Sequence, residues 1–143
     1  MSQEQNCVFC KIIAGEIPAA KVYEDEHVLA FLDISQVTEG HTLVIPKKHE
    51  KDIYELSEES AQHVFKVVPK IARAIKKQFQ PVGINLLNNN EAPAGQSVFH
   101  YHIHILPRYH RNEGFGVTWK TNNDKYTPEK LNEIAKRIGD GIE

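Results

Sequence analysis

The most constraining feature of this chain is a run of three histidines that alternate with bulky side chains between Phe99 and Leu106. The run reads His100-Tyr101-His102-Ile103-His104-Ile105. Successive side chains of a β-strand point to opposite faces of a sheet. If the segment is a strand, the three imidazoles share one face, about 6.5–7 Å apart, and Tyr101, Ile103 and Ile105 face the core. The pattern predicts a strand with one core face and one face for imidazole chemistry.

The chemistry of that face has three possible readings. An exposed polar edge is disfavoured, because three identical titratable side chains at strand spacing are hard to explain on a merely solvated face. Two histidines at positions i and i+2 can share one Zn²⁺, with Zn–N distances of about 2.1 Å. A nucleophilic imidazole supported by its neighbours is the third reading. The residues alone do not separate the last two.

Length and composition predict one globular domain spanning residues 1–143. Hydrophobic residues make up 41% of the chain and charged residues 25%, and the net charge is −2. This balance predicts no broad attraction to nucleic acid or to membranes. The longest apolar runs, such as residues 82–87, are too short to span a bilayer, and the first residues lack the features of a signal peptide. We therefore expect a cytoplasmic protein.

The order of the expected elements indicates an α+β fold. We expect a short helix over residues 7–14, strands over 21–23, 27–34 and 41–46, a long helix from Ser57 to about Phe79, strands over 83–87 and 98–106, and a final helix that begins at Thr127-Pro128. Ser57 and Thr127 are good N-caps. Because most strands follow one another directly, an antiparallel sheet of about five strands fits better than a doubly wound parallel sheet.

A second candidate site is the pair Cys7 and Cys10, which are separated by two residues. Two such thiolates can bind one Zn²⁺ from a tight turn. Redox activity is less favoured, because a thioredoxin-like motif follows a strand, and the pair could also have no role. The remaining zinc ligands would be histidines, and the candidates are His41, His49, His110 and the triad.

Two further segments carry polar groups beside apolar runs. Asp33 follows residues 29–32 and is either a turn residue or a carboxylate that accepts hydrogen bonds from ribose hydroxyls. Gly95, Gln96 and Ser97 precede the histidine run. Glycine permits close approach of backbone to a ligand, and the hydroxyl can donate to a phosphate or a leaving group.

Four segments together resemble the histidine triad (HIT) superfamily, and the nearest resemblance is to its bacterial, Hint-type phosphoramidase branch. The segments are residues 31–34, 41–49, 94–98 and 100–106, and the likeness extends from about Cys7 to the C-terminal helix. The resemblance implies an antiparallel sheet carrying helices, and a homodimer formed through the long helix and a sheet edge.

The resemblance also implies a reaction and a binding site. His102 would attack the α-phosphorus of a purine nucleoside monophosphate derivative (of AMP or GMP), and water would then release the nucleotide from His102. His104 and Ser97 would contact the phosphate and the leaving group, Asp33 would hold the ribose hydroxyls, and Asn89 would lie near ribose and phosphate. Gly95 and Gln96 would also belong to the nucleotide-binding residues. The apolar purine slot would be formed by Val8, Phe9, Ile12, Phe31, Leu32 and Ile34.

For the cysteine pair, the resemblance implies a structural Zn²⁺ bound by Cys7, Cys10, His49 and His100. Two other functions are alternatives. Leu106-Pro107-Arg108 is more similar to the dinucleoside polyphosphate hydrolase branch, and a non-catalytic nucleotide-binding scaffold could use the same fold. Residues 111–125, which include Trp119, do not resemble the C-terminal tail of the eukaryotic phosphoramidases, so the leaving group stays open.

Overall fold

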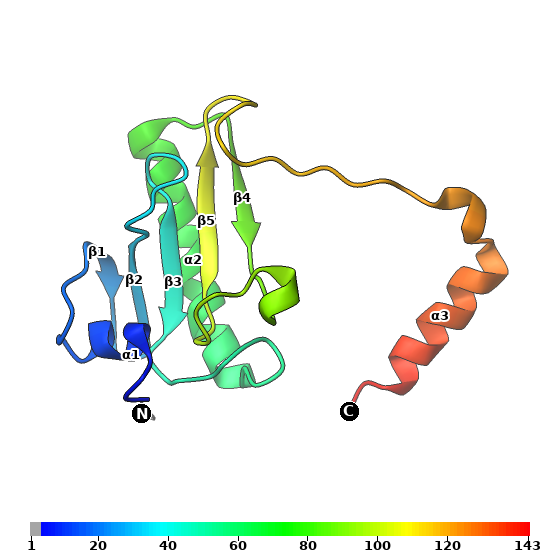
Figure 1. The fold of residues 1–143 in the computed structure, drawn as a ribbon, viewed down its shortest axis with the longest axis horizontal. Coiled ribbons are helices and arrows are strands. Elements are labelled where there is room, and N and C mark those ends of the chain that lie inside the picture. Colours follow the sequence, from blue (N-terminus) through cyan, green and yellow to red (C-terminus); the bar gives the residue numbers. More distant parts are fainter. Residues whose placement is uncertain (1–3) are drawn as a thin grey trace.

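The computed structural model describes residues 4–143 (Figure 1). Its elements are α1 (Val8–Ile13), β1 (Lys21–Glu24), β2 (Val28–Leu32), β3 (Thr42–Pro46), α2 (Glu58–Phe79), β4 (Gly83–Leu87), β5 (Ile103–Arg108) and α3 (Pro128–Asp140), with single 3-10 turns at Ala92–Ala94 and Asn123–Lys125. The prediction of an α+β fold with a long helix and helices near both ends is confirmed.

The strands form one antiparallel sheet in the order β1-β2-β3-β5-β4. The histidine-bearing strand β5 therefore lies between β3 and β4. His104 pairs with Leu43 of β3 on one side and with Leu87 of β4 on the other. This interior position fixes the backbone of β5 from both sides, so the side chains that it presents are held rigidly.

Helix capping follows the sequence closely. The Ser57 side chain accepts a hydrogen bond from the backbone N–H of Ser60 at 3.1 Å, and Thr127 does the same for Lys130 at 3.2 Å. Pro128 occupies the first turn of α3, where a missing N–H costs no helical hydrogen bond. Both predicted N-caps are confirmed.

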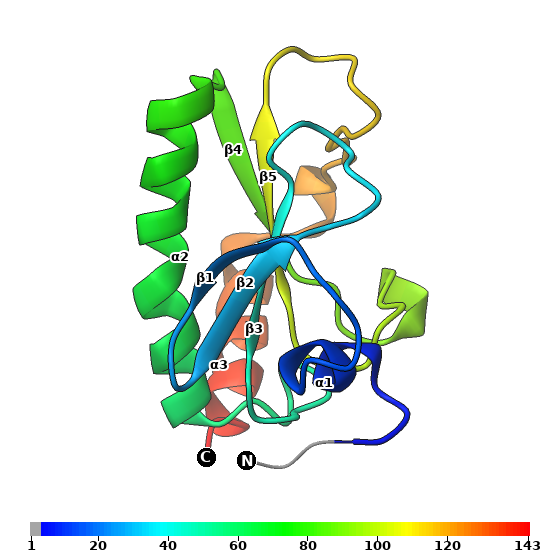
Figure 2. The ribbon, with the colours of Figure 1, turned by 90° about the vertical axis from the view of Figure 1, so that its left-hand side faces the viewer.

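The sheet has a different apolar layer on each face. One layer joins the sheet to α2, and it includes Tyr101, Ile103 and Ile105, as the alternation predicts. The other layer joins the sheet to α1, with Phe9 and Ile12 packed against Leu29, Phe31, Leu43 and Ile45. Figure 2 shows α2 and α1 on opposite sides of the sheet. The histidines alternate with the α2-facing residues, so they belong to the α1 side.

The strand predicted over residues 98–106 is wrong at its start, because β5 begins at Ile103. The backbone N–H of Tyr101 donates to the carbonyl of Glu50 at 2.7 Å, and the carbonyl of His102 accepts from the Asn88 side chain at 3.0 Å. These partners replace a strand ladder before Ile103. The alternation of side chains nevertheless continues through the irregular segment.

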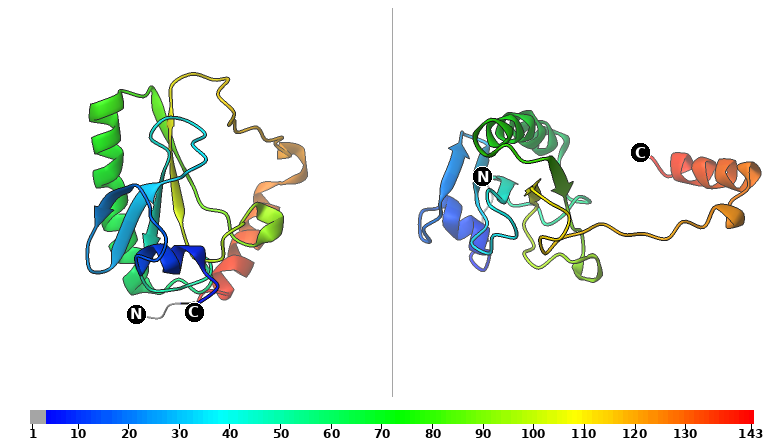
Figure 3. Two further views of the ribbon diagram at one scale, coloured as in Figure 1. Left: turned by 60° about the vertical axis from the view of Figure 1, so that its left-hand side comes forward. Right: turned by 90° about the horizontal axis from the view of Figure 1, so that it is seen from above.

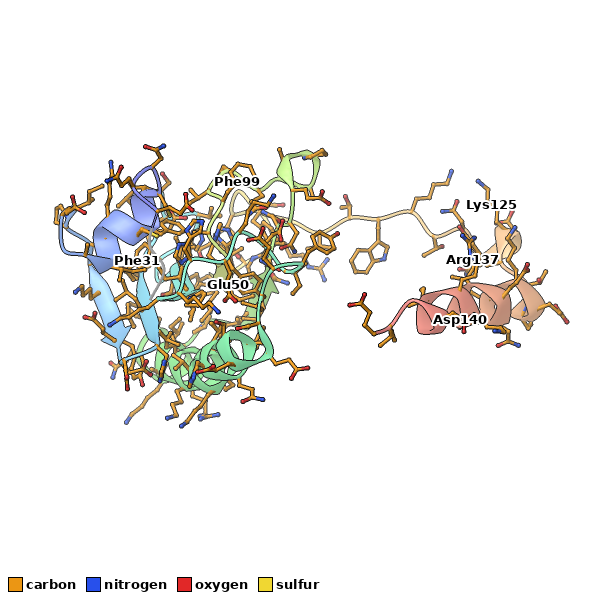
Figure 4. The ribbon with its side chains drawn as sticks, turned by 90° about the horizontal axis from the view of Figure 1, so that it is seen from below. Phe31, Glu50, Phe99, Lys125, Arg137 and Asp140 are labelled. Carbon is orange, nitrogen blue, oxygen red and sulfur yellow. The ribbon has the colours of Figure 1, made fainter. Side chains whose placement is uncertain are left out.

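The C-terminal part of the chain leaves the sheet as an extended segment and ends in α3, well away from the other elements (Figures 1 and 3). Figure 4 shows Lys125, Arg137 and Asp140 in this part, apart from Phe31, Glu50 and Phe99 in the body. Of the residues in α3, none is buried. Within residues 4–143, no helix is both long and apolar enough to cross a membrane.

Candidate functional site

Four side chains from distant parts of the sequence meet beside α1. Cys7 caps the helix and Cys10 lies within it, while His49 follows β3 and His100 precedes β5. Their four candidate ligand atoms lie within 4.8 Å of one another. His100 is fully buried, and the two cysteines are nearly so. Of the histidines that the sequence left open as ligands, the structure brings His49 and His100 to the cysteines.

The geometry of this cluster fits a tetrahedral metal ion. The Sγ–Nδ1 distances are 3.4 Å for Cys7–His100, 3.4 Å for Cys10–His49 and 3.6 Å for Cys10–His100, and the two Nδ1 atoms are 3.2 Å apart. With Zn–S bonds of about 2.3 Å and Zn–N bonds of about 2.1 Å, the edges of a tetrahedron are about 3.4 Å between nitrogens, about 3.6 Å between sulfur and nitrogen and about 3.8 Å between sulfurs. The donor set, two thiols and two imidazoles, is one that Zn²⁺ prefers. The cluster can therefore hold a metal ion.

Neighbouring groups and burial determine the tautomer and the protonation state of the side chains in the cluster. His100 Nε2 lies 2.7 Å from the carbonyl of Pro46, so this nitrogen carries the proton and Nδ1 presents its lone pair to the cluster. Burial lowers the pKa of His100 to about 4, which keeps the imidazole neutral at pH 7. Burial raises the pKa of the Cys10 thiol to about 11, so a metal ion must displace that proton when the sulfur binds it.

The tautomer of His102 is set by the backbone of His100. His102 Nδ1 lies 2.8 Å from the carbonyl oxygen of His100 and donates its proton to it. Nε2 is then left with a free lone pair. His102 is only 5% exposed, and burial lowers its pKa below the ordinary value of 6.5. At neutral pH this imidazole is uncharged and has one nitrogen available as a nucleophile.

His104 is oriented by a hydrogen-bond chain that starts in the loop between β2 and β3. The backbone N–H of Val37 donates to His41 Nδ1 at 3.3 Å, so His41 carries its proton on Nε2. That nitrogen lies 2.9 Å from His104 Nδ1 and 3.6 Å from a carboxylate oxygen of Asp33. His104 therefore accepts at Nδ1 and keeps a proton on Nε2. Burial and the neighbouring His102 and His41 lower the pKa of His104 to about 4.

A cavity of about 440 Å³ opens beside His102 and His104. Asp33 and Ser97 also line it, and the proposed purine slot supplies its apolar wall: Val8, Phe9, Ile12, Phe31, Leu32 and Ile34. Phe9 of α1 contacts His102 edge-on, with ring centroids 5.2 Å apart. The cavity thus combines an apolar wall, a carboxylate, a hydroxyl and two neutral imidazoles. Such a site suits a ligand with an aromatic base and a phosphate.

Three residues expected to bind nucleotide lie outside the lining of this cavity. Asn89 and Gly95 face each other in the loop before β5, where the Asn89 amide lies 3.5 Å from the Gly95 carbonyl. Gly95 has a φ of +101°, and a Cβ there would come within 3.3 Å of Asn89. The buried Gln96 side chain bridges the loop by bonding the carbonyls of Lys51 and Val98. These contacts shape the loop that presents Ser97.

The sequence offers His41 only as one of several candidate zinc ligands, so its position beside His104 was missed. The structure buries it, at 3% exposure, against His104. Sequence reasoning also missed part of the cavity wall, namely Ile17, Pro18, Ala19, Ser35, Leu43 and Val98. The signal for His41 is its place directly before β3, whose Leu43 pairs with His104.

Comparison with known proteins agrees with this geometry. The protein named Hit from Bacillus subtilis is 65% identical over 134 residues, which is 94% of this chain and 92% of that protein. Crystal structures of a HIT family protein from Bacillus anthracis and of a HIT family member from Bacillus subtilis are each 62% identical. They cover 97% of this chain and 99% of their own, with TM-scores of 0.95 and 0.94.

More distant relatives have names that describe a metal or an activity. A crystal structure of a zinc-bound histidine triad family protein from Mycobacterium smegmatis is 33% identical over 96% of this chain and 98% of its own, with a TM-score of 0.72. An adenosine 5'-monophosphoramidase from Schizosaccharomyces pombe is 39% identical over 96% of this chain and 98% of its own length. An adenylylsulfatase from Arabidopsis thaliana is 45% identical over 94% of this chain and 66% of its own length.

The family profile described as the HIT domain matches residues 14–111, a span that holds the histidine run, His41 and His49. Together with the identities to Bacillus proteins over nearly the whole length, this match shows that the chain belongs to the HIT family.

Proposed function

We propose that this protein hydrolyses purine nucleoside monophosphate derivatives at the α-phosphate through a nucleotidyl-histidine intermediate on His102. The observation that carries the proposal is the bond from His102 Nδ1 to the His100 carbonyl, in a side chain that lines the cavity. This bond makes Nε2 the free nitrogen, and a neutral imidazole is a competent nucleophile at pH 7. The relatives that act on adenylyl compounds support the same assignment.

The proposed reaction has two displacements at phosphorus. His102 Nε2 attacks the α-phosphorus, the bond from phosphorus to the leaving nitrogen or oxygen breaks, and the leaving group takes up a proton. Water then attacks the same phosphorus, the P–N bond to His102 breaks, and the nucleoside monophosphate leaves. His104, which carries its proton on Nε2, can donate a hydrogen bond to a phosphate oxygen or to the leaving group.

The cavity provides a place for each part of the substrate. The purine would lie between the apolar side chains of α1 and β2, with Phe9 and Phe31 as its aromatic neighbours. Asp33 would accept hydrogen bonds from the ribose hydroxyls, and Ser97 would lie next to the phosphate. The loop before β5 would contribute Asn89, Gly95 and Gln96. These residues would keep Ser97 in place and hold the backbone of the loop close to the phosphate.

The metal in the cluster would be a structural Zn²⁺ bound by Cys7, Cys10, His49 and His100. Four protein donors leave a tetrahedral ion no open position for substrate or water. Bound there, the ion would cross-link separate parts of the chain and would not contact the substrate. It would tie α1, and with it Phe9, to the backbone that carries His102.

Turnover of defined substrates tests the proposal. Purified protein should hydrolyse adenosine phosphoramidate or lysyl-AMP, and His102→Ala should lower turnover by several orders of magnitude. His63→Ala is the matched control, because His63 lies on α2 and stacks on His27, away from the cavity. A panel of P–N, P–O–P and P–S substrates of one nucleoside would rank the leaving groups. Tight AMP binding with negligible turnover on every substrate would instead support a binding scaffold.

A further inference from the structure

Outside the site described above, two histidines and a carboxylate gather on the surface where the turn between β1 and β2 meets the first turns of α2 (Figure 2). His27 lies in that turn, and Glu59 and His63 lie on α2. The candidate ligand atoms of the three side chains lie within 4.8 Å of one another. We call these three residues the hairpin cluster. They do not line the nucleotide cavity, so the proposed function leaves them unused.

The spacing of the ligand atoms in the hairpin cluster is close to what one metal ion requires. The rings of His27 and His63 are stacked, with centroids 3.8 Å apart and planes that differ by 11°. His63 Nε2 lies 3.6 Å from a carboxylate oxygen of Glu59, one helical turn earlier. Two nitrogens bound to one tetrahedral Zn²⁺ are about 3.4 Å apart. Rotation of the side chains would open the stack and point both rings at the ion.

The backbone holds both sides of the hairpin cluster in place. The Asp25 carboxylate accepts the backbone N–H of His27 at 2.7 Å, and the backbone N–H of Lys47 donates to the His27 carbonyl at 2.8 Å. On the other side, Ser57 caps α2 two residues before Glu59. Binding of an ion would therefore order only side-chain torsions, which keeps its entropy cost low.

The donors and the charge around them favour a divalent transition metal. Imidazole suits Zn²⁺, Cu²⁺ and Ni²⁺, whereas Mg²⁺ and Ca²⁺ prefer oxygen ligands. A second carboxylate, that of Glu26, lies 3.8 Å from His27 Nε2. Lys47, whose backbone contacts His27, directs its ammonium group to Glu24 at 2.8 Å. The negative charge of Glu26 and Glu59 is therefore available to a cation.

We propose that the hairpin cluster is a second metal site, in which His27, Glu59 and His63 bind one exchangeable Zn²⁺ or a similar divalent transition metal ion. Three protein donors leave one position of a tetrahedral ion open to water. His27 and Glu59 are exposed, so this ion would exchange with solvent more readily than one bound by the buried Cys7 and Cys10. Bound there, the ion would fasten the hairpin that carries β2 to the start of α2.

The hairpin cluster and the nucleotide cavity are separate, so this site holds or fails independently of the proposed activity. Dialysis against a weak chelator should empty the hairpin cluster and leave the cluster of Cys7, Cys10, His49 and His100 filled. The metal that remains after such dialysis therefore belongs to the cysteine-containing cluster, and the metal taken up again belongs to the hairpin cluster.

A calorimetric titration of the dialysed full chain tests the site. The protein should take up one further Zn²⁺ per chain, and Mg²⁺ should give no uptake. Glu59→Gln and His63→Asn should each weaken this step at least about tenfold, because loss of a ligand costs at least as much as loss of a residue that only orients one. Glu58→Gln, which removes the other acid of the same helical turn, and His110→Asn, which removes an exposed histidine elsewhere, should leave it unchanged.

Two results of the titration would overturn the proposal. One is the absence of a further binding step in the wild-type chain. The other is a step that Glu59→Gln and His63→Asn leave as strong as Glu58→Gln and His110→Asn do, because the ion would then bind elsewhere on the surface.

Spectroscopy on the wild-type chain identifies the ligands without relying on the folding of a variant. Co²⁺ added to the dialysed protein should bind without a thiolate-to-cobalt charge-transfer band, because the hairpin cluster contains no sulfur. The imidazole NMR signals of His27 and His63 should broaden at lower Co²⁺ concentrations than that of His110. A thiolate band from the first addition would place the ion at the cysteines, and earlier broadening of His110 would place it elsewhere. Either result would contradict the assignment.

Discussion

His102 donates its Nδ1 proton to the backbone carbonyl of His100 across 2.8 Å, and His100 is itself one of the four clustered residues that could hold a metal ion. The carbonyl that fixes the tautomer of His102 therefore belongs to a residue that the cluster holds. His100 is held a second time by the carbonyl of Pro46. The candidate metal cluster and the proposed nucleophile are therefore mechanically linked through the backbone of His100.

Metal analysis should find about one Zn²⁺ per chain in carefully prepared protein, and Cys7→Ser/Cys10→Ser should lose it. Because the cluster ties α1 to the segment before β5, losing the metal should lower Tm by roughly 5 °C or more, equivalent to about 1.5 kcal/mol. His63→Asn, which removes a histidine outside the cluster, should keep both the metal and the Tm. Metal content that is unchanged in the double cysteine variant would remove the zinc assignment.

The pH dependence of kcat/KM should reflect the burial of His102. Burial lowers the pKa of His102 below 6.5, and the neutral form is the nucleophile. The midpoint of the acid limb should therefore lie below pH 6.5, the ordinary value for a free imidazole. The measurement is kcat/KM for adenosine phosphoramidate between pH 5 and 8. An acid limb centred at or above pH 6.5 would show that His102 titrates as an exposed histidine.

His41 should act as a positioning residue for His104. His41→Leu removes the donor 2.9 Å from His104 Nδ1 and should lower kcat by up to about 100-fold, as expected for a misplaced catalytic group. His41→Gln keeps a side-chain donor and should recover part of the loss. Equal losses in the two variants, with unchanged thermal stability, would mean that the hydrogen bond has no part in catalysis.

The side chains of β5 that face α2 should contribute to the stability of the fold and not to activity. Ile105 of β5 is fully buried in the layer between the sheet and α2. Ile105→Ala should therefore lower the free energy of unfolding by about 2–5 kcal/mol. Val82→Ala, at a residue that is 77% exposed, should change it by less than about 0.5 kcal/mol. Urea melts of the two variants give the comparison. If Ile105→Ala lowered the free energy of unfolding by no more than Val82→Ala, this layer would not be the core.

Local patterns were sufficient to predict much of this fold. The strand over residues 83–87 coincides with β4, and the caps of both long helices are read from Ser57 and Thr127. These features depend on neighbours within a few residues, which the sequence displays directly. The start of β5 was missed because it depends on Glu50 and Asn88, whose contacts with Tyr101 and His102 exist only in the folded chain.

The site shows the same division between local and distant information. The spacing of Cys7 and Cys10 indicates a metal site, but the residues alone left His41, His49, His110 and the triad open as partners. The pairing of β3 with β5 sends His41 to His104, whereas His49, beyond the end of β3, reaches the cysteines. The amphipathic pattern of α3 was visible in the sequence, but its position was not, because its own body does not hold it.

The most direct test of the account is to trap the intermediate. Protein mixed with lysyl-AMP, quenched within one turnover and digested, should yield a peptide that carries one adenylyl group, and fragmentation should place that group on His102. The group should be absent from His102→Ala and present in His63→Ala. An adenylyl group on any other residue, or steady hydrolysis by His102→Ala at the wild-type rate, would contradict the proposed mechanism.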